Sequence, residues 1–289
     1  MPDDPHAPLV FTSADAMRAW SRQQHHGGHT VAVVPTMGAL HGGHLALIEA
    51  ARSRATRVVV TIFVNPLQFD ESSDFEHYPR PIDDDIEVCR SLGVAAVYAP
   101  TAATMYPAGF QTHVEPGALA EPFEGATRPG HFRGVATVVT KLFGATAADL
   151  AVFGEKDFQQ LAVVRRLAAD LDLGTEIVAV PIAREADGLA RSSRNVRLSP
   201  ADRAAAVVLS RSLAAGAAAH AAGERRADVL RQTVERGITA EPAARLEYVA
   251  VVDVTDLRPL DVVDRPAVML VAARFGEVRL IDNRVLDGR

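Results

Sequence analysis

The chain has 289 residues, of which 48% are hydrophobic and 23% charged, with a formal net charge of −6 and one cysteine, Cys89. This composition is typical of a globular protein, weighs against nucleic acid as a partner, and excludes an intrachain disulfide and a cysteine-based metal site. No apolar run approaches the roughly 20 residues that span a bilayer, and the acidic, proline-rich stretch at 1–5 does not resemble a secretory signal, so we expect a cytoplasmic protein without membrane partners.

Short, nearly continuous apolar runs alternate with helical patterns in the N-terminal part of the chain. The apolar runs predict strands buried on both faces at 31–34, 58–64, 94–98, 150–153 and 177–180. The patterns between them predict helices at 43–55, 81–92, 135–144 and 157–171. This alternation predicts an α/β fold with a Rossmann-like, doubly wound parallel sheet. Ligands bind such sheets at the carboxyl ends of the strands.

The pattern changes after about residue 184. Alanine-rich and helical sequence at 200–223 and 227–238 is followed by strand-like runs at 248–254, 268–273 and 278–282. Helices followed by consecutive strands predict a small α+β unit. We therefore expect a nucleotide- and substrate-binding domain at 1–183 and a smaller C-terminal domain at 184–289 that closes over the nucleotide.

A glycine- and histidine-rich segment lies where the first buried strand meets a helix. It reads Pro-Thr-Met-Gly-Ala-Leu-His-Gly-Gly-His from Pro35 to His44. A strand-to-helix junction offers free backbone N–H groups and the positive end of a helix dipole, which favour a phosphate. Histidine adds N–H donors. Taken alone, the segment is also compatible with a tight turn whose histidines are incidental.

Two further segments lie at or near strand ends. Asn65 and Gln68 follow the second strand, where neutral amides can bind hydroxyls and carboxylates; a simple capped strand end is the alternative. Arg128 and His131 precede a helix and form a possible anion site; a solvated basic loop is the alternative.

The last two segments lie at 153–160, which begins Phe-Gly-Glu-Lys-Asp, and at 184–195, which ends Arg-Ser-Ser-Arg-Asn. Lys156 can act as a point charge toward phosphate, although Asp157 at the helix start is also a good N-cap. The second segment is dense in hydrogen-bond donors for a linker. Four of the five segments follow or adjoin a strand's carboxyl end, so together they favour one binding site.

The five segments in this order resemble the pantoate–β-alanine ligase family, within the nucleotidyltransferase superfamily that carries a His-x-Gly-His motif. The resemblance extends from about Val31 to Asn195 and returns at 273–276 and 279–283. It implies that pantoate, β-alanine and ATP, with Mg²⁺, give pantothenate, AMP and pyrophosphate through a pantoyl adenylate. It also implies a homodimer that binds only small-molecule substrates.

The resemblance also implies roles for individual residues. Catalysis would fall to His44, His41, Lys156, Ser192, Ser193 and Arg194, with His44 matching the usual proton donor. Pantoate and β-alanine would be bound by Gln68, Gln160, Asn65, Arg128 and His131. ATP would be bound by Pro35, Thr36, Met37, Gly38, Ala39, Leu40, His41, Gly42, Gly43, His44, Gly154, Glu155, Lys156, Asp157, Ala183, Arg191, Ser192, Ser193 and Arg194. Mg²⁺ would be held mainly by the ATP phosphates.

Two positions depart from the family pattern, and two other functions stay open. Gly42 stands where many relatives have a charged or amide residue. Arg191 stands where Met or Leu is usual, and its side chain would contact phosphate or point to solvent.

Asp83–Asp85 are expected to form a solvated helix start rather than a metal site. The alternatives are a related nucleotidyltransferase that adenylates another small acid, and a catalytically inactive nucleotide-binding paralogue.

Overall fold

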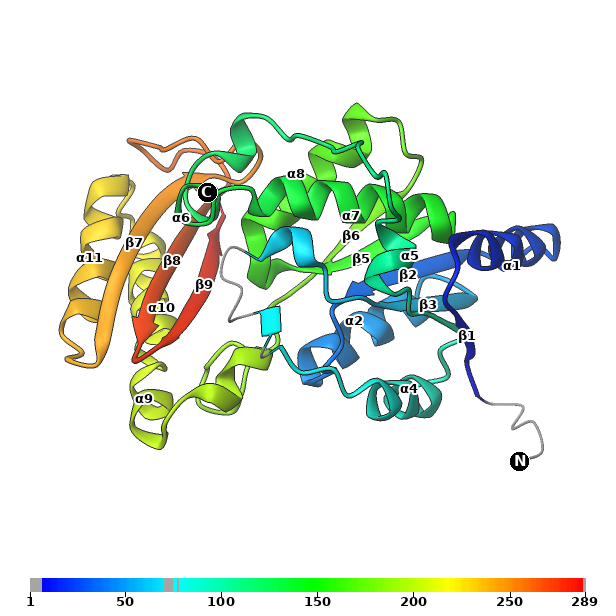
Figure 1. Cartoon of the computed structure of the whole chain (residues 1–289). Helices are drawn as coiled ribbons and strands as arrows, with labels where there is room; N and C mark the ends of the chain where they lie inside the picture. Colours follow the sequence, from blue (N-terminus) through cyan, green and yellow to red (C-terminus); the bar gives the residue numbers. More distant parts are fainter. Residues whose placement is uncertain (1–6, 70–74, 77, 288–289) are drawn as a thin grey trace. The chain divides into compact units, whose positions relative to one another are not determined.

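The computed structural model describes residues 7–69, 75–76 and 78–287 (Figure 1). These residues form two compact units. The first extends to residue 155 and includes 163–180, whereas the second comprises 156–162 and the chain from 181 onward. Residues 156–162 follow Glu155 of the first unit but belong to the second.

The first unit is built on a six-stranded, entirely parallel sheet. Its order is β1-β4-β3-β2-β5-β6. The strands are β1 (Leu9–Phe11), β2 (Val31–Thr36), β3 (Arg57–Ile62), β4 (Ala96–Tyr98), β5 (Leu150–Gly154) and β6 (Glu176–Val180). The chain moves outward from β2 in one direction and from β5 in the other, so the order reverses between these two neighbours. This is the position at which doubly wound sheets bind ligands, and the predicted fold class is confirmed.

Helices cover both faces of this sheet (Figure 1). On one face, Ile48 and Ala51 of α2 (Gly42–Arg52) and Cys89 of α4 (Ile82–Ser91) pack on alternate strand residues such as Val34 and Val60. On the other face, α1 (Ala14–His26) and α7 (His131–Thr146) contact β2 and each other. The remaining helical segments are η1 (Pro66–Gln68), α5 (Ala102–Met105), η2 (Ala118–Ala120), α6 (Glu124–Thr127), η3 (Glu155–Asp157) and α8 (Phe158–Asp170).

The predicted helices and strands of this unit are present with ends shifted by a few residues, but the sequence does not predict β1 and α1. β1 has only three residues, and α1 is mostly polar, with only Met17 and Ser21 buried, so neither gives a clear apolar period. Helix α7 begins four residues earlier than the periodicity indicates, because Gly130, with φ +82°, turns the chain into the helix just before His131.

The second unit is the predicted α+β structure. An antiparallel sheet in the order β7-β8-β9 is formed by β7 (Ala244–Asp253), β8 (Ala267–Phe275) and β9 (Val278–Leu286). Helices α10 (Val208–Ala221) and α11 (Ala227–Thr239) supply Leu209, Leu213 and Leu230 to a core that includes Met269 of β8. The single helix predicted at 200–223 is divided into α9 (Pro200–Ala205) and α10, and η4 (Ser193–Arg197) precedes them.

One segment, Pro200–Ala221, is long and apolar enough to cross a membrane by length and composition alone, contrary to the expectation from sequence. In the structure this segment contributes Leu209 and Leu213 to the core of the second unit. Its apolar character is therefore accounted for by packing.

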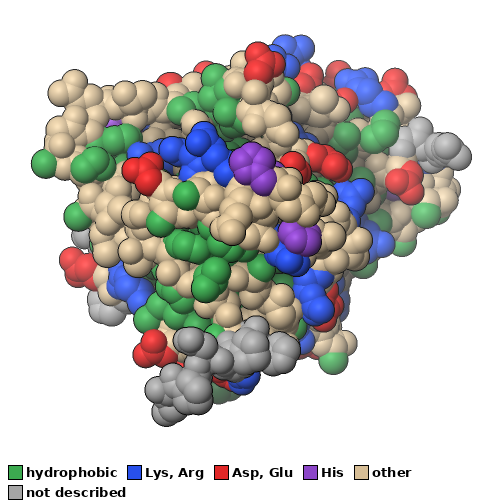
Figure 2. Space-filling view, turned by 90° about the vertical axis from the view of Figure 1, so that its right-hand side faces the viewer, with side chains coloured by type: hydrophobic (Ala, Val, Ile, Leu, Met, Phe, Trp, Pro, Cys, Tyr) green, Lys and Arg blue, Asp and Glu red, His purple; other side chains and the backbone are tan. Residues whose placement is uncertain are grey.

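Charge is mixed on the face shown in Figure 2. Lys and Arg side chains lie among Asp and Glu side chains there, with small groups of hydrophobic side chains between them. On this face the charges of the two signs are not separated into large patches.

Candidate active site

The turn between β2 and α2 is held by hydrogen bonds to the neighbouring strand. The Thr36 hydroxyl donates to the carbonyl oxygen of Thr61 on β3 at 2.6 Å and accepts from the N–H of Gly38 at 3.1 Å. Gly38 and Ala39 then adopt positive φ values of 82° and 51°. A Cβ on Gly38 would lie 2.8 Å from an oxygen of Asp85, so this position requires glycine.

His41 and His44 together cap the start of helix α2, because each imidazole accepts a backbone N–H there. The N–H of His41 donates to Nδ1 of His44 at 3.2 Å, and the N–H of Gly43 donates to Nδ1 of His41 at 3.1 Å. Both Nδ1 atoms therefore act as acceptors, so the ring proton lies on Nε2 in each case. The ring centroids are 4.1 Å apart. The capping arrangement thus fixes two neighbouring imidazoles with Nε2–H as the donor.

His44 is neutral at physiological pH. Burial, and then the nearby His41, lower the pKa of His44 from 6.5 to about 3. A second proton on its ring would also replace the lone pair that accepts the His41 N–H. His44 therefore offers a hydrogen bond, not a positive charge.

The expectation of free backbone N–H groups is wrong for most of this junction. The N–H groups of Gly38, Ala39, Leu40, His41 and Gly43 all donate to side chains of the protein. Those of His44 and Leu45 donate to the carbonyl oxygen of His41. Side chains therefore bind most of the N–H groups at this helix start.

Asp85 is the side chain that holds the middle of the turn. Its two carboxylate oxygens accept from Ala39 N–H at 2.8 Å and Leu40 N–H at 2.7 Å, and only 2% of the residue is exposed. Burial raises the pKa of Asp85, with the two N–H groups acting in the opposite direction. The expectation of a solvated helix start is therefore wrong for Asp85, although Asp83 and Asp84 are exposed.

Asn65 and Gln68 form one hydrogen-bonded unit after β3. Asn65 is 1% exposed; its amide donates to Gln68 Oε1 at 2.9 Å and to the carbonyl oxygen of Gly134 at 3.1 Å. Its oxygen accepts from Tyr106 Oη at 2.7 Å and from Leu67 N–H at 3.3 Å. These four bonds use all the donors and acceptors of the Asn65 amide and fix its position. The bond from this fixed amide to Oε1 then orients the Gln68 side chain.

Gln68 links the predicted substrate residues to the turn between β2 and α2. Its Nε2 lies 3.1 Å from the Met37 sulfur. Its main-chain oxygen interacts with Arg128 at 3.0 Å and with His131 Nδ1 at 2.8 Å. The structure therefore brings Met37, Gln68, Arg128 and His131 together, with Arg128 and His131 bound to the Gln68 backbone.

The remaining predicted residues lie around η3 and in the chain after β6. Gly154 ends β5, Glu155–Asp157 form η3, and Gln160 lies in the first turn of α8. The backbone oxygen of Lys156 accepts from Asn283 Nδ2 at 3.0 Å. Lys156 and Gln160 belong to the second unit, as does the segment that contains Ser192–Arg194.

A short hairpin at 184–190 leads into the Ser192–Arg194 segment. Arg191 N–H donates to the carbonyl oxygen of Ala183 at 2.9 Å, and Ser192 caps η4 by accepting from Arg194 N–H at 3.2 Å. The Arg191 guanidinium lies 3.1 Å from a carboxylate oxygen of Glu185. This cation is thus neutralised by a neighbouring acid.

Sequence reasoning assigned no site role to Asp85, Tyr106, Arg184 or Asp282, although Arg184 begins the segment at 184–195. Asp85 had a detectable signal, because it shares a helical face with Cys89 and Leu92 and so occupies a core-facing position. A buried carboxylate there requires hydrogen-bond donors. Tyr106, Arg184 and Asp282 have partners 41 to 98 residues away, which no local pattern reveals.

Comparison with known proteins gives a consistent result. The family model described as pantoate-β-alanine ligase matches residues 9–285. A pantothenate synthetase of Heliobacterium modesticaldum is 51% identical over 278 residues, covering 96% of this chain and 99% of the relative. One of a Roseiflexus species is 52% identical over 258 residues, covering 89% and 93%.

Solved structures agree with the sequence relatives. The crystal structure of pantothenate synthetase from Thermus thermophilus has a TM-score of 0.91 at 44% identity, covering 96% of this chain and 98% of that one. Pantoate-β-alanine ligase from Francisella tularensis, complexed with β-γ ATP and β-alanine, has a TM-score of 0.78 at 31% identity with the same coverage. By its sequence, by its fold and by the residues at its strand ends, this chain belongs to the pantoate–β-alanine ligase family.

Proposed function

We propose that this chain condenses pantoate with β-alanine at the expense of ATP, forming pantothenate, AMP and pyrophosphate. The observation that carries the proposal is the agreement of nearly the whole chain, residues 9–285, with this family. The Francisella relative, 31% identical, was solved with an ATP species and β-alanine, which supports both as ligands here.

In the first step, a pantoate carboxylate oxygen bonds to the α-phosphorus of ATP, the bond to the bridging oxygen breaks, and pyrophosphate leaves. A carboxylate with a pKa near 4 is already ionised at neutral pH, so this step needs no general base. It needs alignment of two anions and stabilisation of the charge that develops on the phosphates.

We assign the phosphate contacts to both histidines, Lys156, Ser192, Ser193 and Arg194. The neutral His44, with its proton on Nε2, suits a hydrogen-bond donor better than the proton donor that the family resemblance implies. The rest of the ATP site would comprise Pro35–Gly43, Gly154, Glu155, Asp157, Ala183 and Arg191.

For pantoate, we assign Gln68 and Gln160 as direct contacts, with Asn65, Arg128 and His131 as neighbours. The assignment of Gln68 is supported by the orientation of its side-chain amide, whose oxygen accepts from Asn65 at 2.9 Å.

In the second step, the β-alanine nitrogen attacks the acyl carbon of the adenylate, AMP leaves with the bridging oxygen, and the amine gives up a proton.

Mg²⁺ is proposed as a partner of ATP. Within residues 7–69, 75–76 and 78–287, no group of three or more His, Cys, Asp or Glu side chains is placed to hold a metal ion. We propose that phosphate oxygens mainly hold the ion, as is usual for Mg²⁺ bound with nucleotides. When bound, it would neutralise phosphate charge.

We further propose a cytoplasmic homodimer that binds no nucleic acid and no membrane. The net charge of −6 supports the absence of a nucleic-acid surface. Sedimentation should give a mass about twice the 30.8 kDa of the chain, and a mass equal to one chain would contradict the dimer.

The function is tested by exchange of labelled pyrophosphate into ATP, with Mg²⁺ and pantoate but without β-alanine. Exchange that depends on pantoate is expected, because adenylate formation is reversible. Exchange with another small acid, but not pantoate, would support a different nucleotidyltransferase. ATP binding without exchange for any acid would indicate an inactive paralogue.

A further inference from the structure

Strand β9 carries two consecutive buried polar residues, Asp282 and Asn283. They are 4% and 3% exposed, although neighbouring Leu280 and Leu286 belong to the hydrophobic core of the second unit. Successive side chains of a strand point to opposite faces, so the pair can reach two separate segments. Buried polar side chains need such partners to offset their desolvation.

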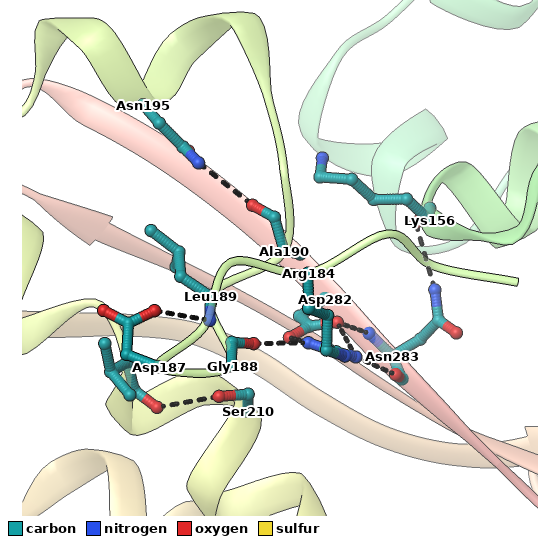
Figure 3. Close-up of polar contacts among 11 residues, drawn as sticks. Lys156, Arg184, Asp187, Gly188, Leu189, Ala190, Asn195, Ser210, Asp282 and Asn283 are labelled. Atoms are coloured by element: carbon teal, nitrogen blue, oxygen red, sulfur yellow. Dashed lines mark hydrogen bonds and ion pairs between the residues drawn. The ribbon is translucent and has the colours of Figure 1, made fainter. Parts of the chain in front are cut away.

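Asn283 reaches the backbone of Lys156. Its Nδ2 donates to the Lys156 carbonyl oxygen at 3.0 Å, across 127 positions of sequence (Figure 3). Because this bond is to the main chain, the Lys156 side chain remains available. The bond fixes the point from which that side chain extends.

Asp282 reaches the hairpin at 184–190. Its two oxygens accept from the Arg184 guanidinium at 2.7 and 2.9 Å, and the same guanidinium donates to the Gly188 carbonyl oxygen at 3.0 Å (Figure 3). Paired charge-assisted bonds of this kind fix orientation as well as distance. Three residues beyond Leu189, the chain reaches Ser192.

We propose that Asp282 and Asn283 are positioning residues for phosphate binding, which rests on the roles proposed above for Lys156 and Ser192–Arg194. Asp282 and Asn283 are consecutive, so their Cα atoms lie about 3.8 Å apart. The segments that carry Lys156 and Ser192–Arg194 are therefore anchored to the same short stretch of β9. A buried ion pair is often no more stabilising than an apolar pair of similar volume. Fixed geometry is therefore the better explanation of the Asp282–Arg184 pair.

The test is Asn283→Leu, which keeps a similar volume and removes the donor. We expect the KM for ATP in pyrophosphate exchange to rise at least about tenfold, with the KM for pantoate within about twofold. Measurements are made well below the melting temperature, with circular dichroism confirming a folded variant. Arg284→Ala, an exposed neighbour on the same strand, is the matched control and should match the unchanged protein.

A double-mutant cycle separates positioning from a general loss of structure. In a Lys156→Ala background the carbonyl that accepts from Asn283 is still present, but the side chain that this bond positions is gone. Asn283→Leu should therefore change the KM for ATP by less than about twofold there. An undiminished effect there would overturn the proposal for Asn283.

Asp282→Asn tests the second contact, between Asp282 and Arg184. It keeps the shape but removes the carboxylate charge, and we expect a raised KM for ATP with little change for pantoate. A lower melting temperature with unchanged KM values in both Asp282→Asn and Asn283→Leu would show a purely structural role. If the unchanged protein shows no pantoate-dependent exchange, the proposed function fails instead.

Discussion

The carboxylate of Asp85 determines the shape of the turn between β2 and α2 at the level of a single residue. It satisfies two adjacent N–H groups, of Ala39 and Leu40, at the point where Gly38 and Ala39 adopt positive φ. A positive φ is unfavourable for alanine and persists only where surrounding contacts impose it. The two bonds from Asp85 supply that constraint.

Replacing Asp85 with asparagine should therefore loosen the turn. The amide offers one acceptor oxygen where the carboxylate offers two, so one N–H would face an NH₂ group. We expect a loss of about 1–3 kcal/mol in the free energy of unfolding, measured by urea denaturation, and a higher KM for ATP. Asp84→Asn, at an exposed neighbouring position, should change stability by less than about 0.5 kcal/mol. Equal stability of both variants would contradict the role of Asp85.

His44 gives a prediction for pH. Because its pKa is lowered from 6.5 to about 3 in the folded protein, the unfolded chain binds this proton more readily. The free energy of unfolding should therefore fall as pH decreases from about 6.5 toward 3, with no contribution from His44 above that range.

His44→Asn isolates this effect, because the Asn oxygen can still accept a backbone N–H but does not titrate. The melting temperature of the variant should depend less on pH between 6 and 4, roughly the interval in which only the unfolded chain takes up this proton. His220, whose pKa is also lowered, titrates in both proteins and cancels in the comparison. Parallel curves for the two proteins would show that His44 is not the group responsible.

At the level of elements, the contact between α7 and η1 positions Gln68. Gly134 on α7 allows this contact, because a Cβ there would collide with the backbone of Leu67 and Gln68. Its carbonyl oxygen also accepts from Asn65. The close approach of the helix and the orientation of the Gln68 amide therefore depend on the same glycine.

Gly134→Ala should push α7 away from η1. We expect a destabilisation of about 1–3 kcal/mol in urea unfolding and a raised KM for pantoate. Gly144→Ala is the matched control on the same helix, since a Cβ there meets no atom within 4 Å. It should be neutral or stabilising by up to about 1 kcal/mol through helix propensity. Similar losses in both variants would rule out the steric explanation.

At the level of the whole molecule, the predicted residues divide between the two units. His41, His44 and Gln68 lie in the first unit, and Lys156 and Ser192–Arg194 lie in the second. Gln68 is oriented by Asn65, whereas Lys156 is held through Asn283. Substitutions in the two networks should therefore affect different substrates.

Gln68→Ala should raise the KM for pantoate about tenfold or more and leave ATP affinity within about twofold, since no ATP contact is assigned to it. Lys156→Ala should show the reverse, with the KM for ATP raised most. Steady-state kinetics with each substrate varied in turn distinguishes the patterns. Weakened ATP binding alone in Gln68→Ala would contradict the assignment to pantoate.

The sequence by itself determines the fold class and the order of the five segments. Continuous apolar runs such as Val31–Val34 can be buried on both faces only in a covered parallel sheet, and this follows from local pattern. The family also follows from local motifs. The short β1 and the polar α1 escape prediction because they carry little periodic signal.

Only the tertiary structure decides how the functional side chains are held and in which chemical form. The N–H groups of the turn are bound to Asp85 and to the two histidines, and Asn283 meets Lys156 across 127 positions. Burial makes His44 a neutral hydrogen-bond donor, where the family resemblance implies a proton donor. Hydrogen-bond partners and desolvation depend on residues distant in the chain, and local sequence does not encode them.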